Sequence, residues 1–507
     1  MATDPAPFSD LHVPPRTPEQ ETQDRKRNRE QTDLLAGKTS ATGTRQRSAV
    51  PDGKDELDQL LEDRRSDAGS NVVHFTTEPT ASRRWSLVVP GELLVRHEDK
   101  RRSPSTEADT ALNDNGFHRL PPDAAGSEIP RELAGRLSVY TYRRSDESRN
   151  QDMRGAMGEL ATPPGGAAGP APGGPAGGAP VQVSPHLVTA LHIVAKAAVG
   201  PAPTQADASD EAFIAAGRRK PQGKVMVAVI DTGIAKANTR TDGWLNEVRR
   251  TPGAEGNIDP LDRFPRPKNG FLDFAAGHGT FAAGIVRLVD RDARIRVYRA
   301  LDSDGFASEL AIAAAMIRAV KDGADVLSLS VGMRTVDDRP SVALELALDV
   351  IDEIVARRKR EAPAVVVSAG NYGDNRPVWP AAFTDRVISV AALNTRMQGA
   401  GWSSRGPWVT CSCIGQGIVS TFVPGDEDPA FSKHHPSWPP PDHYPKNAWA
   451  VWSGTSFAAP QIAGAISRMM REKGITSPPR AARRLLQRGT PTPNFGRALR
   501  LLPGTRT

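Results

Sequence analysis

Five continuous apolar runs in the second half of the chain constrain its fold more than any other feature. They lie at 225–230, 295–298, 326–330, 364–368 and 387–391. Runs without polar alternation are typical of parallel strands that are buried on both faces of a sheet. Helix-like stretches at 307–321 and 341–357 separate some of these runs. Strands that alternate with helices predict βαβ units, and therefore an α/β fold with a mainly parallel central sheet.

The first half of the chain has a different composition. Gly 45 and Pro 44 are high numbers for 507 residues, which indicates that a sizeable part of the chain is not packed core. A linker of mostly Gly, Pro and Ala at 162–180 carries much of this excess. We therefore expect four segments. A polar disordered tail spans residues 1–81, and a small α+β module spans 82–145. A Gly/Pro-rich linker with one helix spans 146–221, and the α/β domain spans 222–507.

Local patterns in the module and the linker predict individual elements. The stretch 85–96 contains a Pro-Gly pair between two apolar runs, which predicts a strand, a turn and a second strand. Alternation over 137–142 predicts a third strand. After the linker, an apolar stretch that opens with Pro185 predicts a helix with proline in its first turn.

Charge and cysteine content exclude several functions. Lys+Arg 65 against Asp+Glu 59 leaves a net charge of +6, which is too small to indicate a nucleic-acid-binding protein. The sequence contains no apolar stretch of 18 residues, so it does not predict a membrane-spanning helix. Cys411 and Cys413 are two residues apart, so on a strand they face the same side and a disulfide between them would be strained. We expect reduced thiols. Since residues 1–10 also lack the pattern of a signal peptide, we expect a cytoplasmic protein.

Four short motifs at the ends of the expected elements carry the chemistry. They are Val-Ile-Asp231-Thr-Gly, Gly-His278-Gly-Thr, Ser-Ala-Gly-Asn371 and Ser-Gly-Thr-Ser456-Phe-Ala-Ala-Pro. A hydroxyl is a poor nucleophile at neutral pH, but an imidazole can take its proton while a carboxylate orients the imidazole. A side-chain amide can donate to the oxyanion that develops during acyl transfer. Each motif alone is ordinary, whereas the four together indicate nucleophilic catalysis.

In this order, the motifs resemble those of the subtilisin-like serine proteases (subtilases) over residues 222–500. The resemblance extends to 297–306, 323–332 and 402–407. It implies a three-layer α/β fold and a serine endopeptidase that works through an acyl-enzyme. Asp231 would orient His278, His278 would act as base and then acid, Ser456 would attack, and Asn371 would stabilise the oxyanion. A lipase-type α/β hydrolase is disfavoured because it requires the order Ser, acid, His.

The resemblance also implies where a peptide substrate binds. An extended substrate would pair with one wall of the cleft, and the primary specificity pocket would lie between that wall and a second one. These walls correspond to Ser330, Val331 and Gly332, and to Ser368, Ala369 and Gly370. Both walls are small and neutral, and Val378 is expected near the pocket floor, so we expect an apolar residue before the scissile bond.

Several positions depart from the family pattern. Asp231 and His278 are 47 residues apart, Phe457 stands where Met is commoner, and Gln461 stands where many members have His. The segment 424–446 is a Pro-rich insertion that leads towards Ser456, and we expect a loop near the rim of the site. Its histidines, His434, His435 and His443, lack the spacing of a metal site. We therefore expect no cofactor. Structural calcium, which is common in the family, stays open as an alternative, and no clear ligand cluster supports it here.

The role of the N-terminal region stays open at this point. Residues 82–145 could form a pro-segment that inhibits the enzyme, a partner-binding module, or a spacer. The expected partner of the chain is a protein or peptide substrate, with neither nucleic acid nor membrane. The alternative to an endopeptidase is a binding protein that uses the protease fold as a peptide clamp, although the complete Asp231, His278 and Ser456 set favours the enzyme.

Overall fold

The structure is a computed structural model of the chain. It describes the following residues: 73–75, 86–97, 106–121, 129–142, 182–191, 204–205, 223–239, 245, 248–250, 257–265, 267–335, 338–430 and 441–502. The predicted linker at 162–180 lies outside this part of the chain, as does the predicted tail apart from a short strand at its end.

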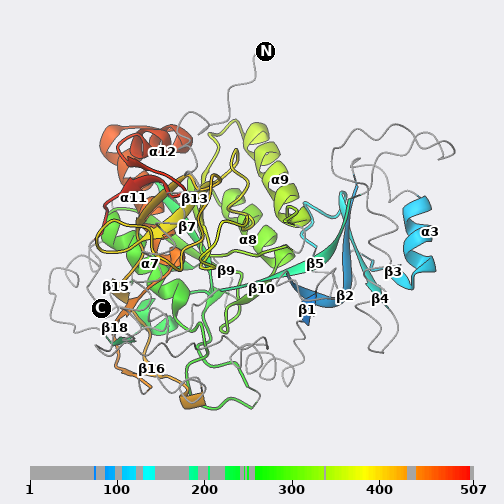
Figure 1. Ribbon diagram of the computed structural model, residues 1–507, viewed down its shortest axis with the longest axis horizontal. Helices are drawn as coiled ribbons and strands as arrows, with labels where there is room; N and C mark the ends of the chain where they lie inside the picture. The colour runs from blue at the N-terminus through cyan, green and yellow to red at the C-terminus, as the bar shows by residue number, and fades with distance from the viewer. Residues whose placement is uncertain are drawn as a thin grey trace, which may run out of the picture.

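A nine-stranded sheet forms the centre of the larger body (Figure 1). In spatial order its strands are β19 (Thr490–Thr492), β20 (Gly496–Leu499), β14 (Cys411–Ile414), β13 (Ile388–Leu393), β12 (Ala364–Ser368), β11 (Val326–Leu329), β7 (Met226–Asp231), β9 (Arg294–Arg299) and β8 (Arg249–Arg250). All neighbours pair in parallel except β19 and β20, which are antiparallel. The five apolar runs are five of these strands, so the predicted mainly parallel sheet is confirmed.

Helices cover both faces of this sheet, which gives three layers. The helices are α7 (His278–Val289), α11 (Thr455–Lys473) and α12 (Pro478–Leu486) on one face, and α8 (Glu309–Lys321) and α9 (Val342–Arg358) on the other. Successive side chains of a strand point to opposite faces. Accordingly, Val227 and Val229 of β7 pack with the first group of helices, whereas Ala228 and Ile230 pack with the second. The predicted three-layer α/β fold is confirmed.

A second sheet, at the right of Figure 1, comes from the N-terminal part of the chain except for one strand that the larger body contributes. Its strands are β1 (Val73–Phe75), β2 (Ser86–Arg96), β3 (Phe117–Arg119), β4 (Leu137–Tyr142), β5 (Gln182–Ala190) and β10 (Phe306–Ser308), and α3 (Thr106–Asp114) precedes β3. The strand predicted at 137–142 is confirmed as β4. The apolar side chains of this sheet join the cluster formed by α8 and α9, so the two sheets share one core.

Two predictions about this region are wrong. The stretch 85–96 is one strand, β2, instead of a strand, a turn and a strand. Gly91, with φ of 69°, accommodates a register shift between Val88 and Leu93 in the pairing with β5, so the Pro-Gly pair produces an irregularity within one strand. The second error concerns the helix expected from Pro185, because this segment is the strand β5. Pairing with β2 and β10 on its two sides outweighs the local helical pattern.

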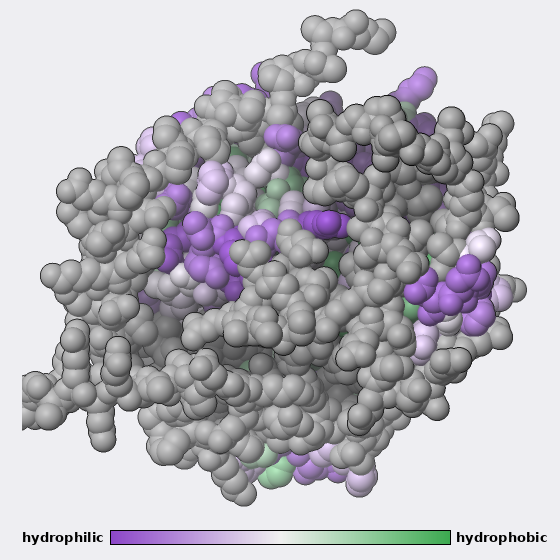
Figure 2. Space-filling model, turned by 45° about the vertical axis from the view of Figure 1, so that its right-hand side comes forward, coloured by the Kyte–Doolittle hydropathy of each residue, from purple (hydrophilic) through white to green (hydrophobic). Residues whose placement is uncertain are grey.

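The remaining strands are short. β15 (Ile418–Thr421), β18 (Trp449–Trp452) and β6 (Thr204–Gln205) form a three-stranded sheet, and β16 (Gly425–Asp426) pairs with β17 (His443–Tyr444). On the face shown in Figure 2, hydrophilic residues predominate among the coloured atoms, and hydrophobic ones occupy small areas. No helix in the described ranges is both long and apolar enough to cross a bilayer.

Candidate active site

Asp231 and His278 meet where β7 ends and α7 begins. His278 Nδ1 lies 2.7 Å from Asp231 Oδ1, and the exposed fractions of the two side chains are only 2% and 0%. Their approach depends on Gly279, because a Cβ atom there would stand 2.2 Å from the carbonyl oxygen of Gly233. The structure therefore brings together two of the predicted residues, 47 positions apart, in a buried carboxylate–imidazole pair.

Two residues that the sequence analysis missed hold this pair in place. Thr232 donates its backbone N–H to Asp231 Oδ1 at 2.7 Å, and its hydroxyl oxygen accepts the N–H of Gly279 at 3.0 Å. The same hydroxyl donates to Asp259 Oδ2 at 3.0 Å, and this oxygen also accepts the N–H of Gly277 at 2.9 Å. Burial raises the pKa of Asp259 to about 6. Thr232 could have been found beside Asp231 in its motif, whereas no local pattern marks Asp259.

Ser456 is the second residue of α11 and directly precedes Phe457, whose ring packs against that of His278. The ring centroid of His278 is 5.0 Å from that of Phe457. The start of a helix presents free N–H groups and the positive end of the helix dipole, which favours a developing negative charge. No hydrogen bond joins the His278 ring to the Ser456 hydroxyl in the described part of the chain. Within the residues that the structure describes, the predicted nucleophile directly precedes Phe457, whose ring contacts the predicted base, and no hydrogen bond joins the two predicted residues.

The carbonyl oxygen of Ser456 accepts a hydrogen bond from the predicted substrate wall, because Pro460 leaves it without its usual donor from the helix. Pro460 is the sixth residue of α11 and lies inside the helix. Because proline has no N–H, it cannot donate to the carbonyl oxygen four residues earlier, which is that of Ser456. Ser330 supplies a donor instead, since its hydroxyl donates to this oxygen at 3.1 Å.

Asn371 is held by the residue that precedes Ser456. Its Oδ1 accepts the N–H and the hydroxyl of Thr455, both at 2.9 Å. Its Nδ2 atom lies 3.6 Å from the point where a Cβ of Gly454 would stand. The side-chain N–H groups of Asn371 therefore lie beside the chain that leads into Ser456, where the sequence predicted an oxyanion donor.

The six predicted substrate-binding residues lie at or just after the ends of two neighbouring parallel strands, β11 and β12. Ser368 donates its hydroxyl to the carbonyl oxygen of Val331 at 3.4 Å, and Gly370 donates its N–H to the Thr455 hydroxyl at 3.1 Å. Val378 is buried, and a Cβ on Gly332 would come within 2.7 Å of its Cγ1 atom. The two expected walls, 330–332 and 368–370, are thus next to each other, with Val378 against the first.

Comparison with known proteins places this arrangement in a family. The sequence pattern of the Subtilase family matches residues 222–498, more than half of the chain. The chain belongs to the subtilase family of serine endopeptidases. It is 29% identical to the "Thermophilic serine proteinase" of Bacillus sp. (strain AK1) over 248 residues, which are 47% of this chain and 50% of that protein. It is 27% identical to thermitase of Thermoactinomyces vulgaris over 266 residues, which are 50% of this chain and 78% of thermitase.

The match thus spans about half the length of the first of these relatives. Among solved structures, the crystal structure of fervidolysin from Fervidobacterium pennivorans, a keratinolytic enzyme related to subtilisin, has a TM-score of 0.49 and 17% sequence identity. That similarity covers 85% of this chain and 62% of fervidolysin.

Aromatic rings pack behind the His278 imidazole of this subtilase. Trp452 meets His278 edge-on at a centroid distance of 5.2 Å, and Phe457 lies 5.0 Å from Trp452. Phe457, which stands where Met is commoner, is therefore part of the apolar wall of the site. The ring of Phe422 packs edge-on against those of Trp452 and Tyr444, at centroid distances of 6.2 and 4.6 Å. Tyr444 belongs to the 424–446 insertion, so the base of this insertion packs near the His278 side of the site.

The other departures from the family pattern have structural roles. Gln461 donates its Nε2 hydrogens to the carbonyl oxygens of Ile414 and Phe457, at 2.7 and 2.8 Å. Cys411 and Cys413 are free and buried on β14. His443 pairs with Asp426, at 2.6 Å, whereas His434 and His435 lie outside the described residues. Within the described ranges, no group of three or more His, Cys, Asp or Glu side chains is placed to hold a metal ion.

The strand β5 of this subtilase lies along the predicted substrate wall. It pairs antiparallel with β10, with Thr189 opposite Ala307. The Thr189 hydroxyl donates to the carbonyl oxygen of Gly332 at 2.8 Å, and Leu191 donates its N–H to the carbonyl oxygen of Gly305 at 2.8 Å. A segment of the N-terminal region therefore contacts one end of the wall that the family resemblance assigns to a substrate.

Proposed function

We propose that the chain hydrolyses peptide bonds as a serine endopeptidase through Asp231, His278 and Ser456. The observation that carries this proposal is the buried 2.7 Å contact between His278 Nδ1 and Asp231 Oδ1 beside the start of α11, the helix that bears Ser456. Asp231 accepts the Nδ1 proton of the neutral ring, so Nε2 is the unprotonated nitrogen that can act as a base.

In the first half of the reaction, the Ser456 oxygen attacks the carbonyl carbon of the scissile bond while His278 Nε2 takes the hydroxyl proton. The negative charge moves to the carbonyl oxygen, where Asn371 Nδ2 and the N–H of Ser456 donate to it. When the carbon–nitrogen bond breaks, the imidazolium returns its proton to the leaving amine. The acyl group stays on Ser456 as an ester.

In the second half, water replaces the amine. His278 takes a proton from the water, whose oxygen attacks the acyl carbon, and the same two donors stabilise the second oxyanion. Breakage of the ester bond then returns the proton to Ser456 and releases the carboxylic acid. Asp231 stabilises the imidazolium in both halves, because a buried carboxylate in contact with it favours the charged ring.

The substrate is an extended segment of a protein or peptide. We propose that it lies between β10 and the wall 330–332, the place that β5 occupies. The residue before the scissile bond enters the pocket between 330–332 and 368–370. Val378, buried against Gly332, supports an apolar preference there.

We propose that the N-terminal region inhibits the enzyme in the same chain. Three observations support this role over that of a spacer. They are the pairing of β5 with β10, the Thr189–Gly332 hydrogen bonds, and the ion pairs that join the N-terminal sheet to α9. A strand in the place of a substrate excludes other peptides by direct competition.

Hydrolysis of an unfolded protein by the full chain and by its Ser456→Ala variant tests the proposed activity. We expect fragments from the first, once it has cut its own N-terminal segment out of the cleft, and none from the second. The variant Ser467→Ala is a matched control, because it removes a buried hydroxyl from the same helix that donates to Asp290, away from Ser456. Equal hydrolysis by the parent chain and Ser456→Ala would contradict the proposal.

A further inference from the structure

A buried carboxylate contacts the N-terminal segment beyond the part of the cleft described above. Glu309 is the first residue of α8 and directly follows β10, and it is fully buried. Its Oε1 accepts the backbone N–H of Leu187 at 2.8 Å. Leu187 lies in β5, two residues before Thr189, which is opposite Ala307.

The other oxygen of this carboxylate is bound by groups of the α/β domain itself. Oε2 accepts the hydroxyl of Ser341 at 2.5 Å and the N–H of Ala343 at 3.1 Å. Ser341 is the N-cap of α9, where its own side chain accepts the N–H of Leu344. Glu309 is therefore fixed by two donors that belong to α9 and its cap.

Oε1 depends on the N-terminal segment for its partner. Within the described ranges, the N–H of Leu187 is the donor recorded on this atom. Glu309 has no exposed surface, and this burial raises its pKa because the negative charge is poorly solvated there. A buried acceptor that loses its donor carries a large free-energy penalty, greater for a charged group than for a neutral one. The free cleft therefore favours any chain that returns an N–H to this point.

We propose that Glu309 forms an additional peptide-binding subsite, which recognises the main-chain N–H of a residue two positions before the one paired with Ala307. This inference rests on the proposed peptidase function of the cleft. The subsite takes any extended polypeptide with an N–H at this position, and it excludes proline, which has none. Its occupant in this structure is Leu187, so the subsite also holds the inhibiting segment in place.

The geometry favours a subsite over a purely structural carboxylate. A chain that pairs with β10 in the register of β5 must pass Glu309, because β10 ends at Ser308. The contact is with a backbone group, so it does not depend on the leucine side chain. It lengthens the recognised segment by two residues beyond the one opposite Ala307.

Hydrogen exchange of the full-length Ser456→Ala chain tests the contact without requiring activity. Leu187→Pro removes the N–H, Leu187→Ala is the matched control that keeps it, and Glu309→Gln replaces the charged acceptor with a weaker one. We expect the amides of 188–191 to exchange at least tenfold faster in Leu187→Pro than in Leu187→Ala, with Glu309→Gln between them. Equal rates in the two Leu187 variants would overturn the proposal.

Peptide hydrolysis by the full chain with Ser456 intact tests recognition in trans. Two peptides copy residues 182–199, one of them with an N-methyl group at the leucine that corresponds to Leu187. We expect the methyl group to raise KM at least tenfold with little change in kcat, and to have a much smaller effect on Glu309→Gln. Equal KM values for the two peptides would overturn the subsite. If a parent chain that has lost its N-terminal piece cuts neither peptide, the proposed peptidase activity fails, and the exchange experiment still decides the role of Glu309.

Discussion

Thr455 donates two hydrogen bonds to Asn371 Oδ1, one from its backbone N–H and one from its hydroxyl, each at 2.9 Å. Both acceptor sites of the amide oxygen are thus engaged by the residue directly before Ser456. This orientation leaves the amide nitrogen on the side of Gly454. The predicted oxyanion donor is therefore positioned by the same short segment that carries the predicted nucleophile.

Removal of the Asn371 side chain tests its role as a donor to the oxyanion. Because such a bond strengthens only in the transition state, we expect Asn371→Ala to lower kcat by about 10²–10³ and to leave KM nearly unchanged. Thr455→Val keeps the backbone donor and loses the hydroxyl, so its kcat should fall by about tenfold or less. Steady-state kinetics on one peptide substrate measures both. A change in KM alone would contradict the assignment.

Replacement of Asp231 tests its role in orienting His278. Asparagine keeps the shape of the side chain but can donate to Nδ1, which favours the tautomer with its proton on Nε2 and so removes the base. We expect Asp231→Asn to lower kcat by about 10⁴ at pH 7. The fold should remain, as circular dichroism can verify. Activity within tenfold of the parent chain would show that the Asp231–His278 pair is structural.

The sequence predicted the elements whose signals are local and missed those decided by distant partners. The apolar runs of β7, β11 and β12 identify buried parallel strands without any knowledge of the fold. By contrast, β5 has a helix-like sequence, and its partners β2 and β10 lie about a hundred residues away on either side. No local pattern reports such pairing.

The same distinction applies to the site. Asp231, His278, Asn371 and Ser456 are found by their motifs, because the tight turns around them require glycine and small residues. Asp259 and Glu309 are ordinary acidic residues in sequence, and only the fold shows that burial and backbone donors surround them.

Acid should loosen the N-terminal sheet through His97. Burial, together with the positive charge of Arg119, lowers the pKa of His97 to about 4 from 6.5. Between pH 6.5 and 4, His97 therefore binds a proton in the unfolded chain but not in the folded one. The free energy of unfolding thus decreases as pH falls through this window. From pH 7 to 5 we expect a loss of about 2 kcal/mol in this sheet.

Hydrogen exchange of β2 and β4 in the Ser456→Ala chain at pH 7 and 5, corrected for the intrinsic pH dependence of exchange, measures this loss. His97→Gln cannot titrate and serves as the control, since a glutamine amide can still bond to Ser138, which His97 contacts through Nε2 at 2.9 Å. The same decrease in both proteins would exclude His97 as its cause.

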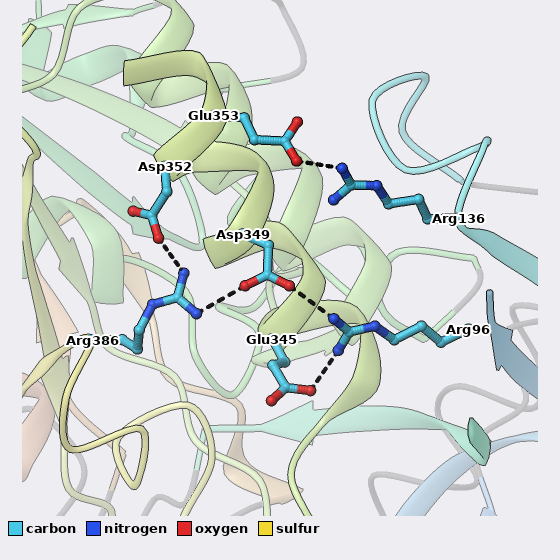
Figure 3. A network of polar contacts seen from close by, with 7 residues as sticks. All are labelled: Arg96, Arg136, Glu345, Asp349, Asp352, Glu353 and Arg386. Carbon is cyan, nitrogen blue, oxygen red and sulfur yellow. Dashed lines mark hydrogen bonds and ion pairs between the residues drawn. The ribbon is translucent and has the colours of Figure 1, made fainter. Parts of the chain in front are cut away.

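Ion pairs with α9 should make the docking of the N-terminal sheet sensitive to salt. Arg96 bonds Glu345 at 2.6 Å and Asp349 at 2.8 Å, and Arg136 pairs with Glu353 (Figure 3). These side chains are partly exposed, so each pair contributes little on its own. We expect the double variant Arg96→Gln/Arg136→Gln to lower the protection of β2 and β4 by about 1–2 kcal/mol in 0.1 M salt, and by less in 1 M salt.

Arg386→Gln is the matched control for this prediction. Arg386 shares Asp349 with Arg96 and also bonds Asp352 (Figure 3). It belongs to the α/β domain, as do both of these carboxylates. Its loss should leave the protection of the N-terminal strands nearly unchanged. A parent-like double variant, or an equal effect of Arg386→Gln, would contradict a docking role for Arg96 and Arg136.

The most direct test of the account is the intact mass of the full-length chain and of its Ser456→Ala variant, followed over time after purification in parallel. An active peptidase whose own segment lies in its cleft should cut that chain. We predict that the parent loses an N-terminal piece while Ser456→Ala keeps its full mass. Loss of the same piece from both proteins would contradict catalysis by Ser456, and an intact parent would contradict cleavage of the segment that lies in its cleft.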